Sequence, residues 1–143
     1  MATVRIDMHQ AAIFDLLHSP AGPVHRKVAS VLRVAEALAK ATAPVDEGRL
    51  KNSHTSSIAD EGVRLRGRLE ATAWYAALVA RGTGIYGPKG TPIRPKKPGG
   101  FLVFRGRDGS LVFAREVKGQ RPNLWLVNAL KLASPWPVDV HPL

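Results

Sequence analysis

The chain has 143 residues, which is enough to bury a hydrophobic core without disulfides or structural metals, and we expect residues 1–143 to form a single domain. It contains no cysteine, which excludes disulfide frameworks, thiolate zinc sites and cysteine nucleophiles. Lys and Arg number 21 against 11 Asp and Glu, so the net charge is +10 and the pI about 10.7. This charge predicts an anionic partner, either a polyanion or an acidic protein surface.

The N-terminal segment does not have the composition of an export signal. Arg5, Asp7 and His9 interrupt it where a signal peptide needs an unbroken apolar run. No window approaches the ~20 apolar residues that span a bilayer. We therefore expect a soluble protein of the cytosol that makes no contact with a membrane.

The first predicted elements are a short edge strand and two helices. Alternation in residues 4–7 favours the strand, and apolar residues at helical spacing favour a helix in residues 11–19 that breaks at Pro20. The clearest helix spans residues 24–43 and ends at Pro44. Its apolar positions recur every three or four residues and predict one buried stripe: Val24, Val28, Val31, Leu32, Ala35, Leu38, Ala39 and Thr42.

A short helix and a long strand are expected next. Asp46 can cap a helix that contains residues 49–51. Residues 63–75 alternate between apolar and polar side chains, which predicts a strand with one solvated face, and Gly67 would mark a bulge or a bend. The polar face carries Arg64, Arg66, Arg68, Glu70 and Thr72, which either follow phosphates or are simply solvated.

The C-terminal half predicts a helix, a hairpin and a closing helix. The helix in residues 75–81 ends at Gly82, and residues 101–104 and 111–117 form a hairpin through Asp108-Gly109. The closing helix follows Pro122 with Asn123 as its cap, and residues 133–143 form an extended tail. Helices precede strands, so we predict an α+β fold in which the long amphipathic helix packs on a small, mostly antiparallel sheet, with short helices and one extended loop.

That extended loop, residues 84–100, reads GIYGPKGTPIRPKKPGG. It is longer than the roughly 12–15 residues above which a loop in a compact domain is usually functional or disordered. It has four basic residues and no acidic residue to neutralise them: Lys89, Arg94, Lys96 and Lys97. The loop lacks the GxxxxGK[ST] pattern of a phosphate-binding loop, so non-specific electrostatic contact is the binding mode that it supports.

The sequence shows no catalytic constellation. Its five histidines are scattered, and we expect them at the surface or capping helices. The acidic pairs 46–47 and 60–61 fall in turns, where capping and solvation are the ordinary roles of a carboxylate. We therefore expect no enzyme, no metal site and no cofactor.

Three sequence elements occur in a fixed order: APVDEGRLKNS (residues 43–53), ATAWYAALVARGTG (71–84) and GQRPNLWLVNAL (119–130). This set, within residues 24–132, resembles the minor tail-component, or neck, family of long-tailed bacteriophages. Glu47 and Ala80-Arg81 depart from the residues usual in that family, as does the polar segment SHTSSI. The main matching positions are Asp46, Gly48, Leu50, Tyr75, Gly82, Thr83 and Pro122.

The resemblance implies a structural virion protein at the head–tail junction, made in the host cytoplasm and built into the particle. It implies a homo-oligomeric ring of six or twelve copies that contacts a connector or portal-side protein and a tail-tube or tail-terminator protein. Residues 84–100 would then be an assembly loop, flexible in the free subunit and laid against a neighbour, or a contact for DNA in the channel. The alternatives are a disordered loop with no partner and, for the whole chain, a small basic protein that binds nucleic acid without sequence specificity.

Overall fold

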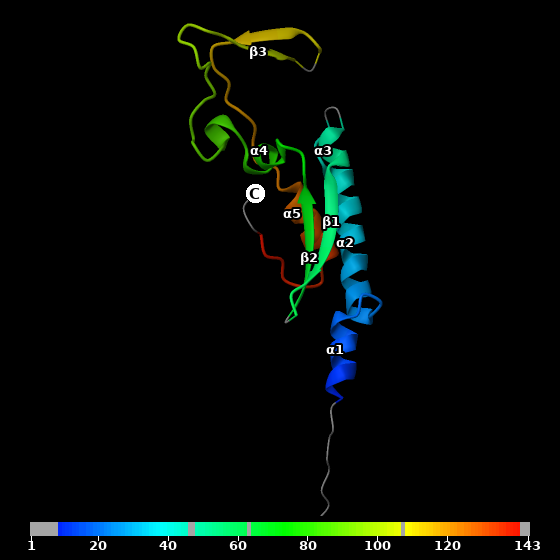
Figure 1. Ribbon diagram of the computed structural model, residues 1–143. Helices are drawn as coiled ribbons and strands as arrows, with labels where there is room; N and C mark the ends of the chain where they lie inside the picture. The colour runs from blue at the N-terminus through cyan, green and yellow to red at the C-terminus, as the bar shows by residue number, and fades with distance from the viewer. Residues whose placement is uncertain (1–8, 46–47, 63, 107, 141–143) are drawn as a thin grey trace, which may run out of the picture. The chain divides into compact units, whose positions relative to one another are not determined.

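The computed structural model describes residues 9–45, 48–62, 64–106 and 108–140. Ten helical and strand elements follow one another in these residues, with the helix α2 as the longest (Figure 1). Two antiparallel two-stranded sheets accompany the helices, which confirms the predicted α+β class. The strand expected at residues 4–7 lies outside the described residues.

The chain contacts form two compact units. Unit 1 contains the described residues up to Thr72 together with residues 126–140, and unit 2 contains Ala73–Trp125. The helix α5 (Trp125–Ala133) begins with the last residue of unit 2.

Unit 1 begins with two helices in the order that the sequence predicts. α1 (Gln10–His18) ends before the proline-glycine break, and α2 (Pro23–Thr42) begins with a proline at its first position, where the missing N–H group costs nothing. The predicted stripe of α2 is confirmed by the burial of Val31, Leu32, Ala35 and Ala39. Thr42 is exposed, so its place in the stripe was wrong: it is the last helical residue, and its hydroxyl donates to Leu38 O at 2.8 Å.

The sheet of unit 1 joins β1 (His54–Asp60) to β2 (Leu65–Ala71). The register runs from His54 opposite Ala71 to Asp60 opposite Leu65. β2 confirms the predicted strand but is shorter: position 63 lies outside the described residues, and the strand stops at Ala71. β1 was not predicted, because its sequence HTSSIAD is mostly polar.

Gly67 makes no bulge, which corrects that expectation. It pairs regularly with Ile58 across the sheet. A Cβ atom at position 67 would stand 3.1 Å from side-chain carbons of Val28 and of Leu32 on α2. The missing side chain therefore lets the helix lie close against the sheet.

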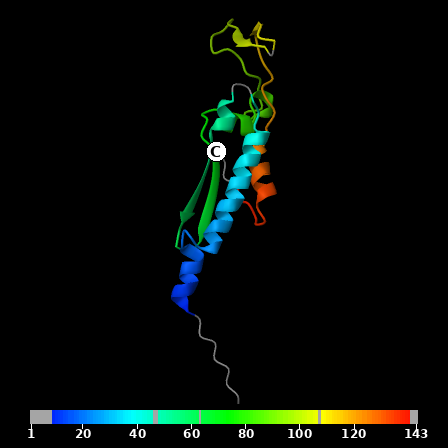
Figure 2. The same cartoon turned by 90° about the vertical axis from the view of Figure 1, so that its right-hand side faces the viewer.

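α2 lies along the β1–β2 sheet in both views (Figures 1 and 2). The contact uses small side chains, since Ala35 and Ala39 are fully buried. Leu69 and Ala71 of β2 are buried as well, and so is Leu50 of α3 (Arg49–Asn52), the short helix that the sequence predicts. The core of unit 1 is thus a thin layer, formed mainly between α2 and the two-stranded sheet, with buried residues of α3 and α5 as well.

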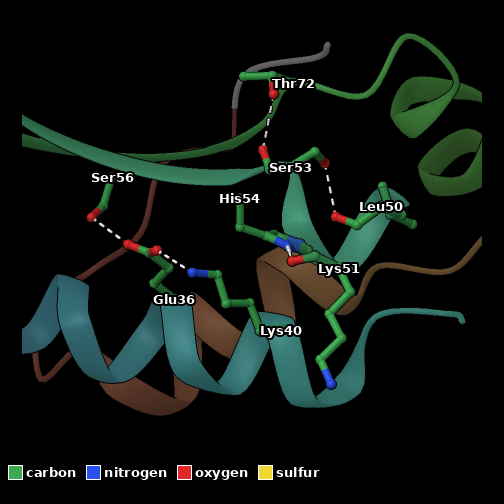
Figure 3. A network of polar contacts seen from close by, with 8 residues as sticks. All are labelled: Glu36, Lys40, Leu50, Lys51, Ser53, His54, Ser56 and Thr72. Carbon is green, nitrogen blue, oxygen red and sulfur yellow. Dashed lines mark hydrogen bonds and ion pairs between the residues drawn. The ribbon is translucent and has the colours of Figure 1, made fainter. Parts of the chain in front are cut away.

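Polar contacts join α2, α3 and the start of β1 (Figure 3). Glu36 accepts hydrogen bonds from Lys40 Nζ at 2.7 Å and from Ser56 Oγ at 2.6 Å. These two bonds, with that to Lys40 the larger contribution, hold the pKa of Glu36 below its ordinary value. Glu36 therefore joins α2 to β1.

His54 is a histidine that caps a helix and does not lie at the surface. Its side chain is buried, with the residue only 3% exposed, and Nδ1 lies 2.9 Å from Lys51 O (Figure 3). That carbonyl belongs to the last turn of α3, so the ring caps the C-terminal end of this helix. The capping part of the expectation is confirmed.

Unit 2 contains α4 (Ala76–Arg81), a single turn of 3-10 helix η1 (Gly84–Tyr86), and a hairpin of β3 (Leu102–Arg105) and β4 (Leu111–Ala114). These elements confirm the predicted short helix and hairpin, although the second strand ends at Ala114 and not at residue 117. Asn123 Oδ1 accepts a hydrogen bond from Trp125 N–H at 3.1 Å, which is the predicted cap of α5. Residues 134–140 after α5 have no helix or strand, as expected of the proline-rich tail.

Candidate assembly surfaces

Two segments that are far apart in the sequence meet at the base of residues 84–100. Thr83 and Gln120 exchange hydrogen bonds: Thr83 N–H donates to Gln120 O at 2.9 Å, and Gln120 N–H donates to Thr83 Oγ1 at 2.9 Å. Ile85 N–H donates to Lys118 O at 2.9 Å. We call this junction of residues 82–85 with residues 118–122 the clamp.

The clamp depends on glycine because the two backbones touch. Gly84 and Gly119 have φ of 64° and 89°, and a Cβ atom on either would collide with backbone atoms of the facing segment. Gly82, at φ 77°, faces Pro122, whose ring carbon would lie 2.9 Å from an added Cβ atom. Only glycine combines this φ with this approach.

The structure therefore brings together three of the seven positions that carry the family resemblance. Gly82, Thr83 and Pro122 come from the second and third sequence elements and meet in the clamp. Tyr75 lies at the start of α4, where its carbonyl accepts the Val79 N–H at 3.1 Å. Gly48 and Leu50 belong to the first element, in unit 1, and position 46 lies outside the described residues.

Residues 84–100, which we call the basic arm, are fastened a second time beyond the clamp. Ile93 and Val117 exchange two backbone hydrogen bonds of 2.9 and 3.0 Å as an isolated bridge. Tight turns close at Gly90 and Gly100, whose N–H groups donate to Gly87 O and Lys97 O. The arm has no regular strand, yet its backbone is paired with the following segment at two levels.

Four basic side chains of the arm, Lys89, Arg94, Lys96 and Lys97, are exposed. One of these four, Arg94, has an acidic neighbour, so the expectation that no acidic residue neutralises them is wrong for Arg94. Arg94 donates to Glu116 Oε2 from Nε at 3.1 Å and from Nη2 at 3.0 Å. Within the part of the chain that the structure describes, the three lysines have no ion-pair partner. The arm therefore offers three unpaired positive charges to an anionic partner.

The net charge of the protein is concentrated in the sequence of unit 2. Residues 73–125 contain ten Lys and Arg and two acidic residues, which gives a net charge of +8, out of +10 for the whole chain. The remaining 90 residues hold eleven basic and nine acidic residues. Most of the net positive charge of the chain thus lies in one unit.

Two arginines near the start of β2, Arg64 just before the strand and Arg66 within it, have an acidic neighbour instead. Glu61 accepts from Arg64 Nε at 2.8 Å and lies 3.0 Å from Arg66 Nη1. The hydrogen bond from Arg64 and the nearby arginine charges lower the pKa of Glu61. This arrangement favours a solvated strand face over a surface that follows phosphates.

The β3–β4 hairpin exposes apolar side chains. Val103 lies opposite Phe113 on one face, and both are more than half exposed, at 55% and 64%. A two-stranded hairpin is marginally stable in water without a further packing surface. We call this surface the outer hairpin face, and it consists of Phe101, Val103, Leu111 and Phe113.

The helix α1 has no buried residue at all. It extends beyond the end of the β1–β2 sheet in both views, so the sheet does not cover it (Figures 1 and 2). Its large apolar side chains are between 36% and 58% exposed: Ile13, Phe14, Leu16 and Leu17. Exposed apolar side chains gathered in this way mark interaction surfaces.

The sequence indicates both apolar surfaces, although neither was predicted from it. The strands FLVF and LVFA do not alternate with polar residues, so a two-stranded hairpin must expose apolar side chains on one face. Residues 6–25 contain no Lys or Arg, although the chain has one for about every seven residues. So long a stretch without basic residues, in so basic a chain, indicates a surface that does not face water.

Other features of the described residues carry no chemistry that we can assign. A shallow, open hollow of about 170 Å³ lies between α2 and β1, lined by Ala29, Leu32, Arg33, Ser56, Ser57 and Ile58. No cluster of three His, Cys, Asp or Glu side chains that could hold a metal ion occurs within residues 9–140 as far as they are described. None of the described helices is long and apolar enough to cross a membrane.

Comparison with known proteins gives no relative: no family model, curated protein or solved structure matches this chain. The resemblance to the phage neck family therefore stays a prediction from the sequence.

Proposed function

We propose that the protein is a structural subunit of the head–tail junction of a long-tailed bacteriophage and acts there as a ring. The observation that carries this proposal is the clamp. Gly82, Thr83 and Pro122, which belong to two separate elements of the family resemblance, meet there and hold the basic arm in place. Residues that carry the resemblance thus have a structural role, which is to hold the basic arm.

Exposed apolar surfaces also support an assembly role. A ring subunit needs two different surfaces that contact its two neighbours, because a heterologous contact closes into a ring by rotation. α1 and the outer hairpin face are two such surfaces, one in each unit. A protein that acts alone would gain little from leaving both of them uncovered.

The charge of unit 2 suits either of two neighbours at such a junction. DNA that passes through a ring would meet Lys89, Lys96 and Lys97 as a weak, non-specific contact. An acidic face of a connector or tail protein would meet the same three charges with a fixed geometry. Both partners are anionic, and the basic arm is the part of the chain that we propose to meet them.

The experiment that tests the proposal is electron microscopy of a lysate in which this gene alone is disrupted. We expect filled heads beside separate tails. Complementation then uses two matched variants, each of which loses three positive charges. Replacement of Lys89, Lys96 and Lys97 by Gln should fail to restore joined particles, whereas replacement of Arg26, Lys27 and Arg33 on α2 should restore them. Joined particles in the disrupted lysate would contradict the proposal.

The concentration of charge in residues 73–125 favours one second candidate, a non-specific nucleic-acid-binding protein. Such a protein should bind duplex DNA with an affinity that falls steeply as salt rises, with a slope set by the number of phosphates that it neutralises. Among described side chains, Arg121 lies over the Tyr86 ring at 5.3 Å, so this aromatic face is partly covered and not free to stack on a base. A steep salt dependence together with joined particles in the disrupted lysate would favour this candidate.

A further inference from the structure

We propose that α1 of one copy packs on the outer hairpin face of a second copy. This contact rests on the proposed function, because it names the two surfaces by which successive subunits of the ring would join. The partner of both apolar surfaces is then another copy of this chain.

The two surfaces are similar in apolar area. Each has four large apolar side chains, at 36–58% exposure on α1 and 54–64% on the outer hairpin face. With about 150–250 Å² for a large side chain, each surface exposes on the order of 400 Å². That is about half of the ~800 Å² that one partner contributes to a standard interface, so a single contact should be weak. Closure of a ring, in which each copy uses both of its surfaces, would strengthen it.

Their charges do not repel each other. The outer hairpin face is bordered by Arg105 and by Arg115, whose guanidinium carbon lies 5.8 Å from the centre of the Phe101 ring. α1 lies in the stretch of residues 6–25 that has no Lys or Arg, and its one acidic residue, the exposed Asp15, is on the opposite side of the helix from Ile13 and Leu17. α1 can thus approach a basic hairpin without repulsion between like charges.

A symmetric contact between two hairpins is disfavoured by the same charges. It would bring Arg105 and Arg115 of one copy towards those of the other, and like charges across an interface are costly. A symmetric contact between two α1 helices would leave both hairpins uncovered. The heterologous arrangement covers both surfaces and has the geometry from which a ring can form.

The test uses one substitution on each surface of the purified full chain. Phe14→Arg places a positive charge on α1, and Phe113→Arg places one on the outer hairpin face. Val34→Arg is the control, because Val34 is also an exposed apolar residue, at 53%, but lies on α2. Sedimentation velocity at rising protein concentration, up to about 0.5 mM for a weak contact, measures association. Circular dichroism establishes that all variants are folded.

We expect the unmodified protein and Val34→Arg to associate as concentration rises. Phe14→Arg and Phe113→Arg should each lose association by at least about tenfold, which corresponds to roughly 1.4 kcal/mol. An equimolar mixture of these two variants should form a dimer that does not grow, because one intact α1 and one intact hairpin remain to pair. This complementation is specific to a heterologous contact.

Other outcomes overturn the inference. If the unmodified protein stays monomeric, the two surfaces do not bind each other and have other partners. Dimers formed by either variant alone would indicate a symmetric contact. A mixture that stays monomeric would show that α1 and the outer hairpin face do not pack on each other. If association uses other residues while gene disruption still separates heads from tails, the contact is wrong and the proposed function stands. Joined particles in the disrupted lysate contradict the proposed function, whatever the centrifuge shows.

Discussion

Thr83 and Gln120 are 37 positions apart and exchange two hydrogen bonds, one between backbone groups and one that uses the threonine hydroxyl. Of the groups that form these two hydrogen bonds, only the Thr83 hydroxyl belongs to a side chain. It accepts the Gln120 N–H at 2.9 Å and so fixes the segment that enters α5 against the segment that leaves α4. The base of the basic arm is therefore set by one side chain as well as by the backbone.

Replacement of Thr83 by Val should loosen the clamp. Valine keeps the shape of threonine but cannot accept the Gln120 N–H bond, so we expect a loss of about 1 kcal/mol in the free energy of unfolding. Hydrogen exchange of the Gln120 amide should become faster, as measured by NMR. Thr83→Ser keeps the hydroxyl and serves as the control. Equal exchange rates in the two variants would show that the hydroxyl bond is not formed in solution.

Gly84 and Gly90 form a matched pair of glycines for testing the clamp. Both have a positive φ, 64° and 62°, but only Gly84 faces backbone atoms, those of Lys118 and Gly119. Alanine at either position pays the cost of the left-handed conformation, about 1–2 kcal/mol. Gly84→Ala must also push the facing segment away, and we expect a clearly larger loss.

Urea denaturation of the two alanine variants measures this difference. Gly90 has open space around its Cα atom, so Gly90→Ala reports the conformational cost alone. Equal losses in the two variants would mean that the two segments do not touch in solution.

The sequence predicted the elements whose pattern is local. The apolar period of α2, the Asp108-Gly109 turn and the glycine that ends α4 each act through neighbouring residues, and each is in place. β1 was missed because its stability comes from elsewhere. Its residues are polar, and it is a strand because it pairs with β2 and lies on α2.

The site was predictable in composition but not in arrangement. The sequence places four basic residues in the loop, and of these Lys89, Lys96 and Lys97 are exposed. The partner of Arg94 is Glu116, which is 22 positions away and enters only through the pairing of Ile93 with Val117. No spacing rule reveals a contact that a long-range bridge creates.

The burial of α2 can be tested with two alanines of the same helix. Ala35 is completely buried and Ala37 is exposed. Ala35→Asp would bury an unpaired carboxylate against the sheet, and we expect it to cost several kcal/mol and to unfold unit 1 at room temperature. Ala37→Asp changes helix propensity alone and should cost about 0.7 kcal/mol or less.

Far-ultraviolet circular dichroism during thermal unfolding separates the two cases. Ala37→Asp should melt close to the unmodified protein, whereas Ala35→Asp should show reduced helix content from the start. A normal melting curve for Ala35→Asp would show that α2 does not pack on the sheet through this face.

Glu36 should make stability depend on pH. Its pKa is lowered in the folded protein by the hydrogen bond from Lys40 and then by that from Ser56, so the folded state favours the carboxylate more than the unfolded state does. The resulting stability is present above the ordinary glutamate pKa of 4.5 and is lost as pH falls below that value through the lowered pKa.

Glu36→Gln removes this contribution and should cost on the order of 1 kcal/mol at pH 7, since both partners are partly exposed. Melting temperatures of the two proteins from pH 7 to pH 3 test the sign. The gap between them should be widest at neutral pH and should close below about pH 4.5. Asp60, Glu61 and Asp108 also have lowered pKa values, but they titrate in both proteins and cancel in the comparison. A gap that stays constant with pH would mean that the Glu36 charge does not join α2 to β1.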